Sequence, residues 1–293
     1  MSELKSKPGI TALLLGSAQD GGLPQLGCNC PNCAAAKASP NTHAQLAVSM
    51  ALVDTSSQRF WLLDCGPDIK AQYDAACLLA GPEATLAGVL ITHLHMGHYT
   101  GLLQMGKEAL DVKGLKVYGT ASVLNFFAVN QPWKGMVAHG TFDLCEVTPD
   151  TPVLLTDQLS ATPWLVPHRA ELSDTVAWCV RGPERRLLFL PDIDSWDAWE
   201  RDLCGVVASV DIALLDACFY SHAELQHRDM RAIPHPVVLD TMSRLALQPG
   251  LARRTVLVHL NHSNPLWSKD GAQRREVEAL GMRVGAAGMQ WQL

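Results

Sequence analysis

The sequence lacks the features that would assign it to several large classes of protein. It has no apolar run close to the roughly 18 to 20 residues that a membrane-spanning helix requires, so no membrane association is expected. Positive charge is not in excess, because 23 Lys and Arg residues stand against 29 Asp and Glu residues. Since nucleic acids attract basic surfaces, no nucleic-acid partner is predicted.

The sequence also lacks internal repeats, low-complexity segments and Gly/Ser-rich linkers. With 293 residues, of which 48% are hydrophobic, it can bury a large core, and one domain spanning residues 1–293 is the simplest prediction. The first apolar stretch, 10–15, stops at Gly16 without the cleavage pattern of an export signal. It therefore predicts a strand, and a cytoplasmic location is expected.

Short apolar runs alternate with stretches of helical spacing. The runs are rich in Val, Ile and Leu and predict buried strands at 11–15, 46–53, 60–63, 88–92, 116–118, 176–180, 187–190, 210–215 and 255–260. Helices are predicted at 69–79, 101–110, 121–130, 196–203, 237–247 and 272–280. This order predicts the α/β fold class.

Three histidines in six residues carry the strongest chemical signal. His93, His95 and His98 follow the apolar run 88–92. A strand would send His93 and His95 to one face and His98 to the other, whereas a loop can aim all three at one metal ion. Neutral imidazole binds zinc, iron and manganese. The alternative, a His-rich surface loop, loses weight because further candidate ligands, His168, Asp192 and His259, lie after or at the ends of later apolar segments.

Asp64, the histidine cluster, His168, Asp192 and His259 together resemble the five ordered motifs of the metallo-β-lactamase superfamily. The resemblance covers nearly the whole chain and implies a four-layer αββα sandwich with two metal positions at one end. It implies that His93, His95 and His168 bind the first metal, that His98 and His259 bind the second, and that Asp192 bridges them. Asp64 would orient the loop through hydrogen bonds.

The sequence departs from this family at Gly97, where the usual pattern has aspartate. The second position would then lose a carboxylate ligand and a unit of negative charge, so a weak second site, a mononuclear site or a different metal is expected. Tyr99 or a cysteine is an alternative source of the ligand. On this interpretation, a Gly97→Asp substitution should raise the metal content.

Three of the nine cysteines form a second cluster at Cys28, Cys30 and Cys33. Three thiolates so close together cannot readily pair as disulfides, whereas zinc accepts all three and needs a fourth ligand. The alternative is a loop of free thiols. The cluster predicts a structural zinc in a loop at about 20–40.

The loop that contains these cysteines resembles a narrower branch of the superfamily, on residues 14–25 and the triplet behind them. This branch holds the coenzyme PQQ biosynthesis B proteins and the cyclic phosphodiesterases of phosphonate degradation. The latter imply that His262 is the fourth zinc ligand, and the B proteins share Asn264-Pro265. Because the B proteins depart from the His-x-His pattern, neither activity transfers directly.

His235 is held between Pro234 and Pro236, at the end of segment 229–236 and before a predicted helix. Superfamily phosphodiesterases resemble this in having an additional histidine that contacts phosphate or protonates a leaving group. The alternative is a histidine that only caps the helix. His222 and His227 are interpreted as surface residues.

These features favour a hydrolase in which a metal-activated water attacks a small ester, lactone or phosphodiester, with Asp192 and His235 as catalytic residues. One or two zinc ions are expected at the active site, with iron or manganese as alternatives. The second hypothesis is iron-dependent oxidation of a quinone precursor or peptide, and the third is a non-catalytic carrier. A small molecule or short peptide is the expected partner, and a homodimer is compatible with the fold.

Overall fold

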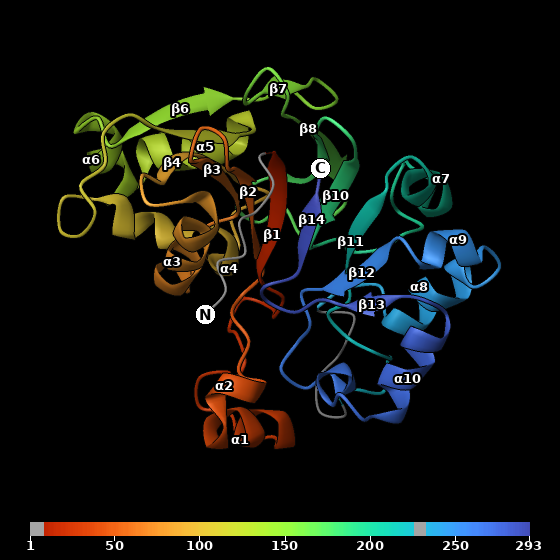
Figure 1. Cartoon of the computed structure of the whole chain (residues 1–293). Coiled ribbons are helices and arrows are strands. Elements are labelled where there is room, and N and C mark those ends of the chain that lie inside the picture. The colour runs from red at the N-terminus through yellow and green to blue at the C-terminus, as the bar shows by residue number, and fades with distance from the viewer. Residues whose placement is uncertain (1–8, 226–232) are drawn as a thin grey trace.

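A computed structural model of the chain describes residues 9–225 and 233–293. Two seven-stranded sheets face each other (Figure 1). The first contains, in spatial order, β14 (Gln290–Gln292), β1 (Ile10–Gly16), β2 (Ser49–Asp54), β3 (Arg59–Leu63), β4 (Thr85–Leu90), β5 (Leu115–Gly119) and β6 (Phe142–Glu146). The second contains β13 (Arg283–Val284), β12 (Thr255–Val258), β11 (Ile212–Asp216), β10 (Arg186–Leu190), β9 (Thr175–Arg181), β8 (Ser160–Val166) and β7 (Val153–Leu154).

The core between the sheets is built from side chains that alternate along the strands. Trp61 of β3 faces the same interior cluster as Trp178 of β9 and Phe189 of β10, and all three are almost fully buried. Successive strand residues point to opposite faces, so the neighbouring residues pack against the outer helices. Both sheets are therefore covered on two sides, which explains why their strands are continuous apolar runs.

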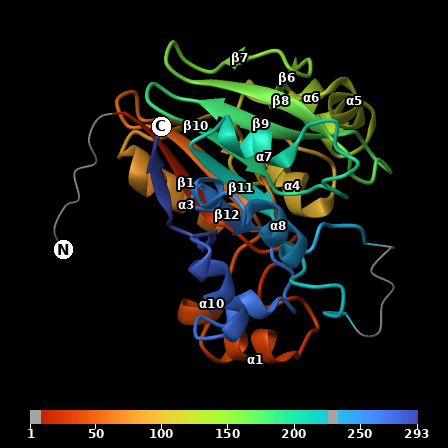
Figure 2. The same cartoon turned by 90° about the vertical axis from the view of Figure 1, so that its right-hand side faces the viewer.

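Helices cover the outer face of each sheet (Figures 1 and 2). The first sheet is covered by α3 (Ile69–Ala80), α5 (Ala121–Val129) and α6 (Trp133–Ala138). The second is covered by α7 (Leu203–Ala208), α8 (Val238–Leu245), α9 (Pro249–Ala252) and α10 (Ala272–Ala279). Short helices at the ends of the strands are α1 (Pro31–Ala38), α2 (Pro40–His43), α4 (Met96–Tyr99), η1 (Thr100–Met105) and η3 (Pro265–Trp267). The αββα architecture is confirmed.

All nine predicted strands are present, with ends that shift by a few residues. Strands β6, β7, β8, β13 and β14 carry no signal that predicted them from the sequence. Strand β8 was hard to see because it contains Pro163 and alternates buried with partly exposed positions. Helices predicted at 69–79, 121–130, 237–247 and 272–280 are confirmed as α3, α5, α8 and α10.

Two predicted helices are wrong. In 101–110, Gly101 packs so closely on the backbone that an added Cβ would lie 2.2 Å from the carbonyl oxygen of Gly66, and only a 3-10 turn forms. In 196–203, the indoles of Trp196 and Trp199 donate to Thr241 and to the Leu165 carbonyl from irregular chain. Their i, i+3 spacing therefore reflects burial rather than a helix, and α7 begins only at Leu203.

The parallel strands determine where the functional loops gather. β3, β4 and β5 run parallel to one another, as do β10, β11 and β12. Because the carboxyl ends of parallel strands lie at one edge of a sheet, the segments that follow β3, β4, β10 and β12 meet there. Among the described residues, no helix has the length and apolar character required to cross a membrane.

Candidate metal centre

The first predicted metal position is formed by three histidines from two different sheets. His93 and His95 lie on the loop after β4, and His168 follows β8. The Nε2 atom of His168 lies 3.1 Å from Nδ1 of His95, and one ring nitrogen from each of the three residues lies within 4.8 Å of the others. His93 and His95 lie on a loop, as predicted, whereas His98 lies in helix α4.

The second predicted position adjoins the first through Asp192, which follows β10. One carboxylate oxygen of Asp192 lies 3.6 Å from Nε2 of His168. The other lies 3.1 Å from Nε2 of His98 and 3.4 Å from Nε2 of His259. Asp192 thus contacts histidines of both positions, as the resemblance implied for a bridging carboxylate.

Asp64 orients the histidine loop from beneath. Its carboxylate accepts hydrogen bonds from the backbone N–H and hydroxyl of Thr92, at 2.8 and 2.9 Å, and from Nδ1 of His98 at 2.7 Å. Because Nδ1 of His98 is used as a donor, its Nε2 faces the metal position as a free acceptor. Asp194, which the sequence analysis missed, holds Nδ1 of His168 in the same way at 2.8 Å.

Two residues of the site have a backbone conformation that is uncommon outside glycine. Asp64 has a φ of 63° and His259 a φ of 62°. Strained backbone of this kind is concentrated at functional sites, where a side chain must be aimed against local preference. His259 directly follows β12, which ends at Val258.

Carboxylates surround the second position with negative charge. Burial alone would lower the pKa of His98, but the carboxylates of Asp64 and Asp192 raise it well above its usual value. The pKa of His259 rises to about 10, because Asp192 and Asp20 outweigh its burial. Burial would raise the pKa of Asp192, but His259 and His98 lower it well below the usual range. The site therefore attracts positive charge, which a divalent cation could supply.

Unpaired polar atoms provide a direct test of whether a metal fits. Nε2 of His93, Nε2 of His98 and one carboxylate oxygen of Asp192 are buried and form no well-aligned hydrogen bond among the described residues, although the last two atoms lie 3.1 Å apart. Leaving such atoms unpaired costs free energy, so native proteins rarely do so without an ion or a bound water. The donor set, imidazole with carboxylate, suits zinc and also iron or manganese.

Gly97 itself has no side chain to offer, but a carboxylate from another part of the chain lies beside the second position. An oxygen of Asp20 lies 3.3 Å from Nε2 of His98 and 3.4 Å from Nε2 of His259. Tyr99 instead packs against Phe126 and Trp133, away from the site. The sequence signal for Asp20 was its place in a Gly-rich loop directly before the cysteine triplet.

His235 lies beside the metal positions, with its ring centre 5.6 Å from that of His168 and 5.7 Å from that of His259. Its Nδ1 donates to Asp216, at the end of β11, over 2.6 Å, and its buried Nε2 has no partner among the described residues. Burial would lower the pKa of His235, but the Asp216 carboxylate raises it well above its usual value. The preceding residues 229–232 lie outside the described residues, as does His227, whereas His222 is exposed.

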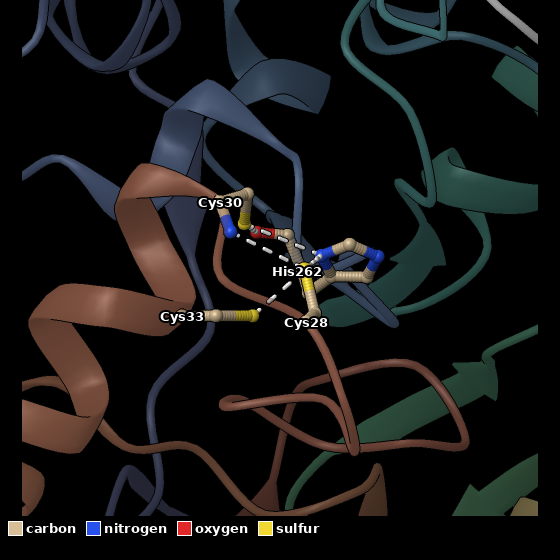
Figure 3. Close-up of side chains that lie close together, drawn as sticks. All are labelled: Cys28, Cys30, Cys33 and His262. Carbon is tan, nitrogen blue, oxygen red and sulfur yellow. Dashed lines mark hydrogen bonds between the residues drawn. The ribbon is translucent and has the colours of Figure 1, made fainter.

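The second cluster brings Cys28, Cys30 and Cys33 around one ring nitrogen of His262 (Figure 3). The three sulfurs lie 3.4, 3.4 and 3.6 Å from Nδ1 of His262. Tetrahedral zinc, with bonds of about 2.3 Å to sulfur and about 2.0 Å to nitrogen, would place these atoms about 3.5 Å apart. The spacing therefore fits one zinc ion, and none of the cysteines is in a disulfide.

Backbone contacts tie this cluster to the rest of the molecule. The side-chain amide of Asn32 in α1 donates to the carbonyl oxygens of His262 and Asn264. The amide N–H groups of Gln25 and Cys30 approach the sulfurs of Cys33 and Cys28 at 3.3 and 3.4 Å, which is typical of thiolates that bind metal. The loop that carries His262 begins three residues earlier with His259, so the two clusters share one segment of chain.

A cleft of about 1070 Å³ is lined in part by Asp20 and by His262 of the cysteine cluster. Its lining includes Gln19, Met96, Phe219, Glu224 and Asn261. The cleft combines apolar side chains with uncharged amides and the carboxylates of Asp20, Asp68 and Glu224, and a mixture of apolar walls with a few polar groups is typical of sites for small ligands.

Comparisons with known proteins agree with this geometry. Residues 59–260 match the model of the family described as "Beta-lactamase superfamily domain". The chain is 28% identical, over 96% of its length and 99% of the relative's, to coenzyme PQQ synthesis protein B of Methylobacterium nodulans. Among solved structures, it superimposes on zinc-bound PqqB from Methylobacterium extorquens with a TM-score of 0.77 and 24% identity, covering 97% of this chain and all of that one.

A second solved structure, a diphosphatase of the PhnP family, superimposes with a TM-score of 0.67 and 17% identity over 97% of both chains. Both structural likenesses concern the fold. The family match spans more than two thirds of the sequence and includes Asp64, the three clustered histidines, His168, Asp192 and His259. Which of these residues bind a metal stays a prediction, but the chain belongs to the β-lactamase superfamily and has its metallo-β-lactamase fold.

Proposed function

We propose that this protein is a metal-dependent hydrolase of a small ester, lactone or phosphodiester. The observation that carries the proposal is the convergence of imidazole and carboxylate groups from separate strand ends on two adjacent positions, with His235 beside them. Zinc bound in such a place lowers the pKa of water toward neutrality and stabilises negative charge on the substrate.

Two residues of the chain would orient the attacking water and protonate the leaving group. Asp192 contacts histidines of both positions and has a depressed pKa, so its carboxylate can accept a hydrogen bond from the attacking water and orient it. His235 is held by Asp216 and has a raised pKa, so its Nε2 can carry a proton to the leaving group. The burial of these groups excludes competing water and strengthens each interaction.

The cleft supports a substrate that is small or a short segment of peptide. A volume of about 1070 Å³ lies at the upper end of the range for small-molecule sites. Glu224 and the amides of Gln19 and Asn261 offer hydrogen bonds at its wall. Since the chain carries a net charge of −6, a highly anionic substrate is less favoured.

A panel of chromogenic substrates tests the proposal. The zinc-loaded protein should hydrolyse at least one of p-nitrophenyl acetate, a thiolactone and bis(p-nitrophenyl) phosphate, and a chelator should abolish the reaction. His222→Ala, which changes an exposed histidine outside the site, is the matched control for His95→Ala. Equal rates for these two variants and for wild type would contradict a hydrolytic role for the metal positions.

Similarity to coenzyme PQQ synthesis protein B over nearly the whole chain favours a second candidate. A site of His93, His95 and His168 can hold iron, and oxidation of a quinone precursor or peptide, with O2 as the oxidant that is reduced, would then replace hydrolysis. Elemental analysis separates the two: iron in addition to the structural zinc favours oxidation, and zinc at both sites favours hydrolysis. We further propose a cytoplasmic location, because a Cys₃His zinc cluster needs reduced thiols.

A further inference from the structure

We propose that Asp20 is the carboxylate ligand of the second metal position, where it replaces the aspartate that the family usually has at position 97. This inference rests on the proposed metal centre. It assigns a ligand from a loop before α1, far in sequence from the histidine cluster.

The geometry at Asp20 is that of a ligand shared with two histidines. The same carboxylate oxygen lies 3.3 Å from Nε2 of His98 and 3.4 Å from Nε2 of His259. One ligand atom from each of these three residues lies within 4.8 Å of the others. Nε2 of His98 is completely buried, so a cation there would pair it with the carboxylate.

The space that Asp20 occupies is available only because residue 97 is glycine. A Cβ added at Gly97 would lie 2.4 Å from the carboxylate oxygen of Asp20, 2.7 Å from its Cγ and 2.6 Å from its Cα. These distances are too short for any side chain, so an aspartate at 97 and Asp20 cannot occupy their places together. Gly97 lies in helix α4 and has no left-handed φ, so the backbone does not require glycine there. Glycine at position 97 therefore removes the usual aspartate and leaves space for the carboxylate of Asp20.

The loop around Asp20 is fixed by backbone hydrogen bonds beside His259. The amide of Gln19 donates to the carbonyl of Leu260 at 2.9 Å, and the amide of Leu260 donates to the carbonyl of Ser17, also at 2.9 Å. A tight turn follows, in which the amide of Gly22 donates to the carbonyl of Gln19 at 2.7 Å and Gly22 has a φ of 66°. Asp20 is thus held at a set distance from His259 by main-chain contacts rather than by its own carboxylate.

Asp20 could instead serve only as an ion-pair partner of protonated histidines, and metal binding separates the two roles. We would measure zinc equivalents by elemental analysis, and zinc affinity by competition with a chelator, for wild type and for Asp20→Asn. Asp20→Asn keeps the shape of the side chain and should lose about one equivalent of zinc or bind it at least roughly tenfold more weakly. Asp68→Asn, at another carboxylate of the cleft whose oxygen accepts from Ala47, is the matched control and should keep wild-type binding.

A reciprocal exchange makes the test independent of any single variant. Gly97→Asp alone should lose metal, because its side chain collides with Asp20. The double variant Asp20→Gly/Gly97→Asp should regain it. Thermal melting and the absorption spectrum of the cobalt-substituted proteins would show whether each variant is folded and how its second position is coordinated.

The outcomes distinguish this proposal from the proposed function. If Asp20→Asn binds zinc as wild type does while His95→Ala loses it, the metal centre stands and the role of Asp20 is wrong. Tighter binding in Gly97→Asp alone would also overturn that role. If wild type binds no metal beyond the structural zinc, both the proposed function and this inference are wrong.

Discussion

The two clusters of candidate metal ligands are built in opposite ways. The Cys28, Cys30, Cys33 and His262 cluster draws three side chains from six consecutive residues, and it is partly exposed except at Cys33. One atom from each of its four residues lies within 4.8 Å of the others. The histidine and carboxylate cluster draws its groups from the ends of several strands and is largely buried. Only the latter keeps polar atoms that are buried and unpaired among the described residues.

This difference is the one expected between a structural metal site and a reactive one. A closed tetrahedral set leaves no position for substrate, so the free energy of metal binding goes into folding. An open set held by hydrogen bonds from Asp64 and Asp194 leaves room for water and substrate. Substitutions in the cysteine cluster should therefore lower stability more than turnover, and substitutions in the histidine and carboxylate cluster should lower turnover more than stability.

The largest effect is expected from Cys30→Ser, because the apparent binding free energy of structural zinc is about 10 to 16 kcal/mol in small zinc domains. Even a decrease of about 3 kcal/mol in the free energy of unfolding would lower the Tm by roughly 5 to 10 °C in a chain of this size. Calorimetry and zinc content measure it, with Cys145→Ser, at another half-buried thiol, as the control. An unchanged Tm and zinc content would remove the structural assignment.

His95→Ala should reduce turnover to background while lowering the Tm by only a few degrees, since His95 is partly exposed and its loss leaves the core intact. Steady-state kinetics with the most reactive substrate of the panel and a thermal melt check both parts. A variant that unfolds instead would mean that this cluster, like the other, is structural.

His235→Gln should lower kcat by about 10² to 10⁴-fold, the usual contribution of a general acid, with metal content unchanged. The glutamine keeps a polar group beside Asp216 but cannot carry a proton. The kcat for substrates whose leaving group needs no proton should fall much less. An equal fall for all leaving groups would contradict a role as acid.

Zinc release from the cysteine cluster should depend steeply on acidity. Burial raises the pKa of Cys33 to about 12 when no metal is bound, so zinc must displace a proton from this thiol. Protons compete more strongly as pH falls, and affinity should drop about tenfold per pH unit for each thiol that takes up a proton. Titration with a chelator between about pH 8 and about pH 6 would measure how zinc affinity changes with pH. An affinity that does not depend on pH would contradict thiolate ligation.

The smallest effect is expected from Asp194→Asn. It weakens the hydrogen bond that orients His168 but removes no ligand, so metal affinity should fall by about 10 to 100-fold. Competition with a chelator measures it. A loss as large as that of His95→Ala would mean that Asp194 itself binds the metal.

The parts of the fold and site that could be predicted from the sequence depend on residues that are close together in the chain. Apolar runs identify strands because both sheets are covered on two faces, and the ends of those runs place Asp64, His93, Asp192 and His259 at the edge. Asp194 and Asp216 also stand at or after strand ends, and the same rule could have found them.

Asp20 could not be predicted in this way. Its contact with His259 joins residues 239 positions apart, and its place depends on the absence of one Cβ at Gly97. In the sequence alone, Gly97 shows only that the usual aspartate is absent. Only the packing of the two loops reveals which group fills the space.

The shared loop of His259 and His262 also has a consequence for how the protein is made. Cys33 and His262 are separated by 229 positions, so a ribosome that adds about 5 to 20 residues per second needs roughly 10 to 50 seconds between them. During that interval the three cysteines are part of a nascent chain in which His262 has not yet been added. His259, which Asp20 contacts in the folded protein, has not been added either. The cysteine zinc site and the second metal position would then be completed within moments of each other, late in synthesis.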